Sequence, residues 1–327
     1  MRNSGFTIIE LLIASALMAI VMVFTLQTFT VNNRTYVKID SVVDTQQSVR
    51  AVASVLERDL RHAGMMVPEG AAACGIDNDD APDLLYVSDY TATNPTNSIG
   101  TFDGALIQNA IVNVNSGSNG LTLDTLVIEA GAPDPSYDTD GNGINDSDFR
   151  VGGGAIIIDL MDLDRGSACG VVTAVNLGTN AITVNIKTTG LNGTPATAAL
   201  TAVPALEYRV DTGRLYRNNL LLADGVEDLQ IAYFLDSNGN NAVDVGELRG
   251  DGDTSPDYVA STSNASDLRE VRLNIVARTR SEDERFTQGF FQAMENRDAV
   301  PGQDGFRRRV HTAIVRMRNV GDRVGGL

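Results

Sequence analysis

Residues 6–24 read FTIIELLIASALMAIVMVF, an apolar stretch in which Glu10 is the only ionisable side chain. A run of about 20 apolar residues is long enough to cross a lipid bilayer as a helix. The polar pentapeptide MRNSG precedes it, and TLQTFTVNNRTYV follows without the small-residue cleavage site of a secretory signal. A plain membrane anchor leaves Glu10 unexplained, because a carboxylate in the apolar part of a bilayer is costly and points to a function.

The helical pattern continues beyond this stretch. Apolar residues recur at steps of three, four and seven, at Val42, Val49, Ala53, Leu56 and Leu60. This spacing places them on one face of a helix. Gly64 then provides a stop signal. We therefore expect one helix over residues 6–63, roughly 85 Å long, apolar all round in its first half and amphipathic in its second.

The order Gly5-Phe6-Thr7-Ile8-Ile9-Glu10 resembles the processing site of type IV prepilins and of type II secretion pseudopilins. The resemblance implies that a prepilin peptidase cuts after Gly5 and that Phe6 becomes N-methylated. It also implies that Glu10 pairs with the N-terminal amine of a neighbouring subunit, so that two membrane-buried charges neutralise each other. The alternative is that Glu10 only complements the helix dipole, an effect worth under about 1 kcal/mol.

Residues 58–64, RDLRHAG, and residues 307–319, RRRVHTAIVRMRN, resemble the PilW group of minor pilins. That resemblance implies a low-copy subunit that primes type IV pilus assembly within an initiation or tip complex. The implied partners are other pilins and minor pilins, bound through the N-terminal helix, together with prepilin peptidase and inner-membrane lipid. The globular part is then periplasmic before assembly and extracellular in the pilus. A J-type pseudopilin of type II secretion and a calcium-stabilised surface adhesin remain alternatives.

After residue 64, short β-type runs alternate with loop signals. In residues 269–278 the apolar residues Val271, Leu273, Ile275 and Ala277 fall on one face of an expected strand, and residues 310–318 are the expected closing strand. The predicted fold class is α+β, a long N-terminal α-helix packed on an antiparallel β-sheet domain with long loops, as in pilins. We expect a leader at 1–5, a transmembrane assembly half of the helix at 6–30, an amphipathic half at 31–64 and a β-rich globular domain at 65–327.

The chain carries 25 Lys and Arg against 42 Asp and Glu, a net charge of −17. This balance excludes the basic surface of a nucleic-acid-binding protein. The acidic residues gather in loops rich in Asp, Asn and Gly, and most of them serve solubility. The basic run 307–309 is either a contact for an acidic partner or a solvated patch.

Two acidic loops have the spacing of oxygen ligands found in EF-hands. The loop 236–247 supplies oxygen side chains at loop positions 1, 3, 5, 9 and 12, whereas the loop 138–148 lacks the terminal glutamate. The alternative is a turn rich in Asx residues, which for the loop 138–148 is an equal contender. The expected calcium ligands are Asp236, Asn238, Asn240, Ala242, Asp244 and Glu247, and in the other loop Asp138, Asp140, Asn142, Ile144, Asp146 and Asp148.

Cys74 and Cys169 are the only cysteines. An oxidising compartment permits a disulfide between them, although their sequence positions do not establish that they are neighbours. The two histidines, His62 and His311, form no H-E-x-x-H motif, and there is no P-loop, G-x-S-x-G elbow or C-x-x-C pair. We therefore expect a protein that is not an enzyme.

Overall fold

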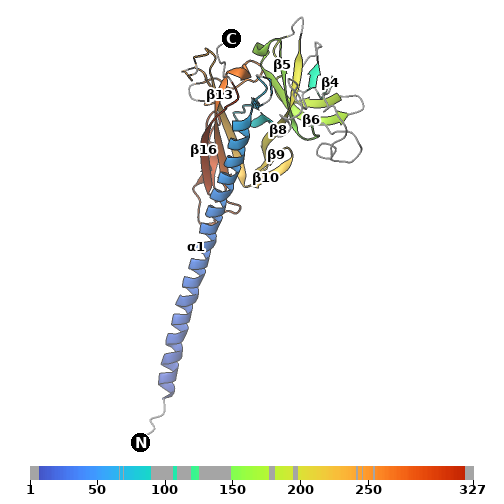
Figure 1. The fold of residues 1–327 in the computed structure, drawn as a ribbon. Helices are drawn as coiled ribbons and strands as arrows, with labels where there is room; N and C mark the ends of the chain where they lie inside the picture. The colour runs from blue at the N-terminus through green and yellow to red at the C-terminus, as the bar shows by residue number, and fades with distance from the viewer. Residues whose placement is uncertain are drawn as a thin grey trace.

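The computed structural model describes residues 7–65, 67–68, 70–89, 106–108, 119–124, 149–176, 181–193, 198–240, 242–244, 246–252 and 255–320. Gly5, Phe6 and the acidic loop 138–148 lie outside these residues. One long helix carries a two-sheet head at its C-terminal end, and its N-terminal half extends away from the head (Figure 1).

The helix α1 spans Ile8–His62, or 55 residues. Thr7 caps its N-terminus in a capping box with Glu10, which satisfies two backbone N–H groups of the first turn. Gly64 follows the helix with a φ of 79°, a left-handed conformation that suits glycine. The end of the helix is therefore where the sequence predicted it.

The two halves of α1 have different surroundings. All residues from 7 to 37 are exposed, and continuous burial on one face begins only at Thr45. The buried face then follows a helical period, with Thr45, Val49, Val52, Ala53, Leu56, Asp59 and Leu60. Packing against the head therefore holds only the last five turns or so of the helix.

A four-stranded antiparallel sheet lies against α1, in the order β12-β11-β13-β16. Val271, Leu273, Ile275 and Ala277 of β13 lie in the main core, which confirms the apolar face predicted for this strand. Asn274 and Val276 on the other face are buried as well. The short β14–β15 hairpin follows β13. The bounds are β11 Val226–Leu235, β12 Leu248–Arg249, β13 Leu268–Arg278, β14 Gly289–Phe291, β15 Val300–Asp304 and β16 Arg308–Arg316.

A ten-stranded antiparallel sheet forms the rest of the head, with the main order β1-β2-β8-β5-β6-β7-β4. Strand β3 also pairs with β8, and β9 links β8 to β10. The bounds are β1 Ala73–Ile76, β2 Leu84–Ser88, β3 Leu106–Gln108, β4 Asn119–Asp124, β5 Gly154–Asp159, β6 Ser167–Asn176, β7 Ala181–Ile186, β8 Leu200–Asp211, β9 Arg214–Arg217 and β10 Leu220–Asp224. Two short 3₁₀ turns, Leu163–Arg165 and Ala265–Asp267, complete the described elements.

Strand β5 explains how the head holds two hydrophobic cores. Its residues are buried on both faces, as a continuous apolar run requires. Ile156 and Ile158 face the main core, which includes Leu56 and Leu60 of α1. Ala155 and Ile157 face a second core between β5, β6, β7 and β8. The α+β class with antiparallel sheets is thus confirmed.

Strands β9 and β10, which extend β8 into a meander, were not predicted from the sequence. Thr212 and Gly213 form its first turn, and Asn218 and Asn219 form its second, all with positive φ values. Two successive residues with positive φ are typical of a type I′ hairpin turn, for which Asn and Gly are the preferred residues. The Thr-Gly and Asn-Asn pairs were the signals that could have revealed these turns.

Candidate interaction site on the exposed helix

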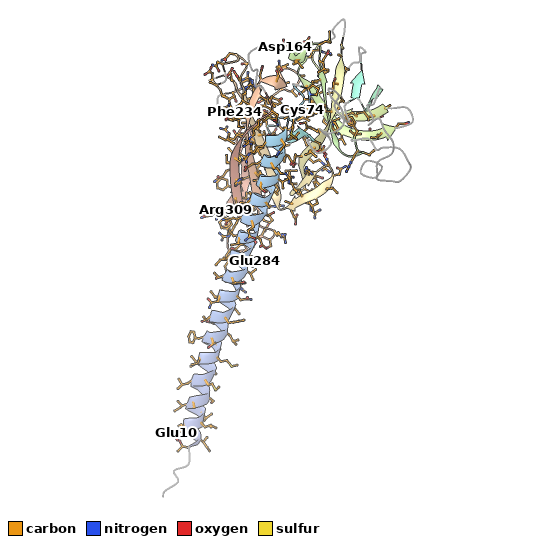
Figure 2. The ribbon with its side chains drawn as sticks, in the orientation of Figure 1. Glu10, Cys74, Asp164, Phe234, Glu284 and Arg309 are labelled. Carbon is orange, nitrogen blue, oxygen red and sulfur yellow. A yellow bond between two sulfur atoms is a disulfide. The ribbon has the colours of Figure 1, made fainter. Side chains whose placement is uncertain are left out.

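The first half of α1 presents apolar side chains in every direction. Ile8 is 81% exposed, Met18 76% and Phe29 69%. Monomeric soluble proteins rarely expose an apolar patch of this extent, so a bilayer or other apolar helices must cover it. Among the described residues, α1 is the one helix long and apolar enough to cross a membrane, by length and composition. Figure 2 shows these side chains projecting from the helix, with Glu10 at the end farthest from the head.

Glu10 and Thr7 form a compact polar cap at the start of this surface. The Thr7 backbone N–H donates to Glu10 Oε2 over 2.9 Å, and the Thr7 hydroxyl donates to the same oxygen over 2.8 Å. The other carboxylate oxygen, Oε1, accepts no hydrogen bond from any residue that the structure describes. The cap therefore fixes the direction of the carboxylate and leaves one oxygen for a cation from outside the helix.

A buried ionic contact fixes α1 to the head. Asp59 is fully buried and accepts hydrogen bonds from Tyr208 Oη over 2.5 Å and from Arg217 Nε over 3.0 Å. Burial and the neighbouring carboxylate together raise the pKa of the Tyr208 hydroxyl. Arg217 neutralises the buried carboxylate, so the contact joins the helix to the β8–β9 hairpin. The sequence analysis missed it, although Asp59 lies between Leu56 and Leu60 in the apolar stripe.

A second polar contact lies where α1 leaves the head. Lys38 Nζ lies 2.7 Å from Asp283 Oδ1, and Arg307 Nη2 lies 3.1 Å from Asp283 Oδ2. The hydrogen bond from Lys38, with support from Arg307, lowers the pKa of Asp283 to about 2. The loop after β13 therefore supports the helix at the boundary between its exposed and packed halves.

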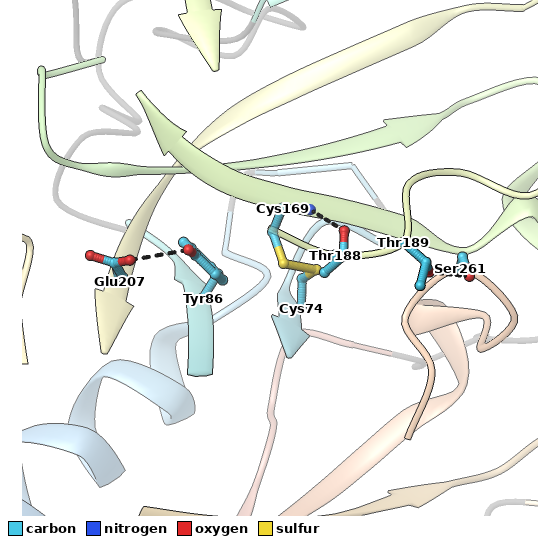
Figure 3. Close-up of a disulfide and its surroundings, with 7 residues drawn as sticks. All are labelled: Cys74, Tyr86, Cys169, Thr188, Thr189, Glu207 and Ser261. Carbon is cyan, nitrogen blue, oxygen red and sulfur yellow. Dashed lines mark hydrogen bonds between the residues drawn. A yellow bond between two sulfur atoms is a disulfide. The ribbon is translucent and has the colours of Figure 1, made fainter. Parts of the chain in front are cut away.

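A disulfide joins Cys74 of β1 to Cys169 of β6 (Figure 3). Both residues are fully buried in the main core. The Cys169 backbone N–H donates to Thr188 Oγ1 over 3.1 Å, and nearby the Tyr86 hydroxyl donates to Glu207 over 3.1 Å. The bond links positions 95 residues apart, and a loop of that length is where a crosslink restricts the unfolded chain strongly.

Hydrogen bonds within the acidic loop 236–247 engage its carboxylates. Glu247 accepts hydrogen bonds from the Ser237 hydroxyl and from the Asn238 and Asp244 backbone N–H groups. Asp236 lies 3.1 Å from Arg269. Across the residues that the structure describes, no group of three or more His, Cys, Asp or Glu is placed to hold a metal ion. Calcium binding by this loop therefore requires some of these hydrogen bonds to be exchanged for the ion.

Comparisons with known proteins match the two ends of the chain. Residues 1–26 match the prokaryotic N-terminal methylation motif, and residues 192–319 match the type IV pilus-assembly protein W family. Among solved structures, a type IV-like pilin from Thermus thermophilus is similar, with 16% sequence identity and a TM-score of 0.27. That match covers 52% of this chain and 88% of the other. No curated protein matches.

Proposed function

Because this chain is a type IV pilin-like protein with a PilW-like C-terminal part, we propose that it is a minor pilin that primes pilus assembly. One observation carries the proposal. The segment that matches the methylation motif leads directly into an apolar half-helix that the head leaves fully exposed. An assembly subunit uses such an apolar surface in two successive surroundings. The surface first faces lipid in the inner membrane and later packs against other pilin helices.

The proposed chemistry is a charge pair at the membrane-buried end of the helix. Cleavage after Gly5 leaves a methylated, positively charged amine on Phe6, one residue before the cap. A lone amine or a lone carboxylate is costly in apolar surroundings, whereas a pair of the two is far less so. Glu10 Oε1, which accepts no hydrogen bond from any described residue, supplies the acceptor for the amine of a neighbouring subunit.

The shape of the head supports a place at the fibre end. The larger sheet extends to one side of α1 rather than along it (Figure 1). A subunit that repeats along a fibre has copies of itself on every side. A head that extends laterally would overlap the space that the heads of those copies occupy. We therefore propose a low-copy position in an initiation or tip complex, with a structural rather than an enzymatic role.

Substitution of Glu10 tests this role. In a strain that lacks the native copy, Glu10→Gln keeps the side-chain size but removes the charge. We expect the variant to accumulate in the inner membrane at the wild-type level and to fall at least about tenfold in sheared fibres, as loss of a desolvated charge pair implies. Ser15→Ala, an exposed polar change on the same half-helix, is the matched control and should incorporate normally.

Two outcomes would contradict the proposal. Normal incorporation of Glu10→Gln into fibres would show that assembly does not depend on the charge pair. Antibody labelling along the whole fibre, rather than at its ends, would contradict the proposed position at the fibre end. Loss of protein secretion without loss of pili in the deletion strain would instead support the pseudopilin alternative.

A further inference from the structure

Strand β16 is an edge strand with a free row of backbone groups. It pairs with β13 on one side and is the last strand of its sheet among the described residues. The Met317 N–H donates to the Arg269 carbonyl, and the Thr279 N–H donates to the Arg307 carbonyl. In this register the odd-numbered residues of β16 bond to β13. The N–H and C=O groups of the even-numbered residues therefore point away from the sheet.

The side chains along this edge do not block a further strand. Val310, Thr312 and Ile314 are exposed, and Ile314 is 58% exposed. Edge strands are commonly protected by charged residues, proline or a bulge, but the centre of β16 has none of these. β-branched residues at successive even positions instead favour strand pairing.

A groove with both apolar and polar walls lies at the N-terminal end of β16. It has a volume of about 360 Å3. Its apolar lining includes Val310 and the phenylalanines at 286, 290, 291 and 306, and its polar lining includes Gln288, Gln292, Arg308 and Arg309. Phe290 is 47% exposed. A strand added beside β16 would place alternate side chains on this face of the sheet. The groove can therefore take an apolar side chain of that strand.

Basic residues lie along the same edge in an otherwise acidic protein. Arg309, Arg316 and Arg318 are exposed and form no ion pair with any described residue, although Glu270 lies opposite Arg316 on β13. Arg318 also lines a groove of about 490 Å3 together with Arg58 and Arg61 at the end of α1. Within that groove Arg58 pairs with Asp59 and Arg61 pairs with Glu57. The charge of this edge is thus opposite to the net charge of −17.

We propose that β16 pairs with an extended, acidic segment of a different protein, which adds a fifth strand to the sheet. The nine residues of β16 match a partner segment of about the same length, with apolar residues alternating and carboxylates facing the arginines. A second copy of this chain fits less well. Antiparallel pairing of two β16 strands about Thr312 places Arg308 of one opposite Arg316 of the other. Arg308 already pairs with Glu227 and Asp304, and β16 has no carboxylate of its own that could face Arg316.

Site-specific photocrosslinking of the full-length protein in its native membranes tests this surface. A benzophenone amino acid replaces Thr312 on the free edge or, as the matched control, Leu220, an exposed residue of β10. We expect only the probe at position 312 to yield a cross-linked peptide from another protein, and sequencing should show it to be acidic with alternating apolar residues. No such peptide, a basic one, or one from a second copy would overturn the proposal.

Two pairs of variants separate strand pairing from general attraction. Ile314→Pro removes an outward N–H without touching the β13 bonds, whereas Ile314→Ala removes only the side chain. Arg316→Glu with Arg318→Glu reverses the edge charge, whereas Arg150→Glu with Lys187→Glu makes the same charge change at exposed residues beside the larger sheet. We expect Ile314→Pro to give a cross-link yield at least about tenfold lower than Ile314→Ala. We expect the charge reversal at 316 and 318 to give a yield at least about tenfold lower than the reversal at 150 and 187.

Equal yields within either pair would overturn the proposal. Formation of the Cys74–Cys169 disulfide in each variant checks that the head has folded. The position of N-terminal cleavage is read from the same samples. Because β16 is distant in sequence from the processing site, a failure of this proposal leaves the proposed assembly role untouched.

Discussion

Asp59 is the residue on which the attachment of the helix depends most. Its carboxylate is fully buried, with Arg217 Nη2 at 2.9 Å and the Tyr208 hydroxyl donating to the same oxygen. Arg58 lies 3.1 Å from the other oxygen. A buried carboxylate of this kind is tolerable only because its donors and its counter-charge are all present, so loss of any partner leaves an uncompensated group.

We expect Asp59→Ala to lower the free energy of unfolding by about 3 kcal/mol, because it leaves the Arg217 charge and the Tyr208 hydroxyl without their acceptor. Chemical denaturation of the detergent-solubilised protein measures this change. Arg61→Ala is the control, because it breaks only the exposed pair with Glu57, worth about 0.5 kcal/mol. An equal loss of unfolding free energy in the two variants would show that the buried contact contributes no more to stability than the exposed pair.

Asp283 makes the attachment sensitive to pH. The pKa of this carboxyl is about 2 in the folded protein, chiefly because Lys38 donates a hydrogen bond to it, against 3.8 for an unperturbed aspartate. A group with a lowered folded pKa stabilises the fold above its unfolded pKa, and this contribution is lost as the pH falls through the folded value.

We therefore expect the difference in Tm between the wild type and Asp283→Asn to be largest near about pH 6 and to shrink between about pH 4 and pH 2. Thermal unfolding followed by circular dichroism over this range gives the two curves. Asp80→Asn, which removes an exposed carboxylate elsewhere, should run parallel to the wild type. A difference for Asp283→Asn that does not change with pH would contradict the ionic origin of this contact.

At the scale of elements, the helix and the turns show where sequence patterns are informative. The helix was predicted within two residues of its observed ends because its apolar period, its cap and Gly64 are all local signals. Strand β13 was predicted for a similar reason, because its apolar face is also a local signal. The contact of Asp59 with Tyr208 was not, because the two residues are 149 positions apart and nothing local specifies that they meet. Folding alone brings them together.

Calcium binding by the acidic loop 236–247 stays a prediction from the sequence. Its side-chain amides already lie close to a carboxylate, since Asn238 Nδ2 and Asn240 Nδ2 both donate to Asp244 Oδ2. We expect saturating calcium to raise the Tm by at least about 5 °C if the ion replaces these donors. Asp244→Asn with Glu247→Gln should abolish the increase, whereas Asp79→Asn with Asp80→Asn should not. If calcium leaves the Tm of the wild type unchanged, the prediction of a calcium site in this loop is wrong.

At the scale of the whole molecule, the surface proposed for membrane attachment and the surface proposed for docking of a partner are separate. The exposed half of α1 ends near Lys38, where the head begins to cover the helix. The free edge of β16 and its basic residues belong to the head, and Arg309 lies on it beside α1 (Figure 2). The chain can therefore remain anchored by its helix while the head binds a partner.

The mass of the N-terminal peptide, isolated from native membranes and from fibres, tests the central claim most directly. We expect a peptide that begins at N-methylated Phe6 in both fractions, because the methylation-motif match covers residues 1–26 and the proposed charge pair needs the new amine as the partner of Glu10. A peptide that begins at the uncut Met1, or after a cut near residue 30, would contradict it. The helix would then be a plain anchor or a removed signal, and Glu10 would have no amine to neutralise.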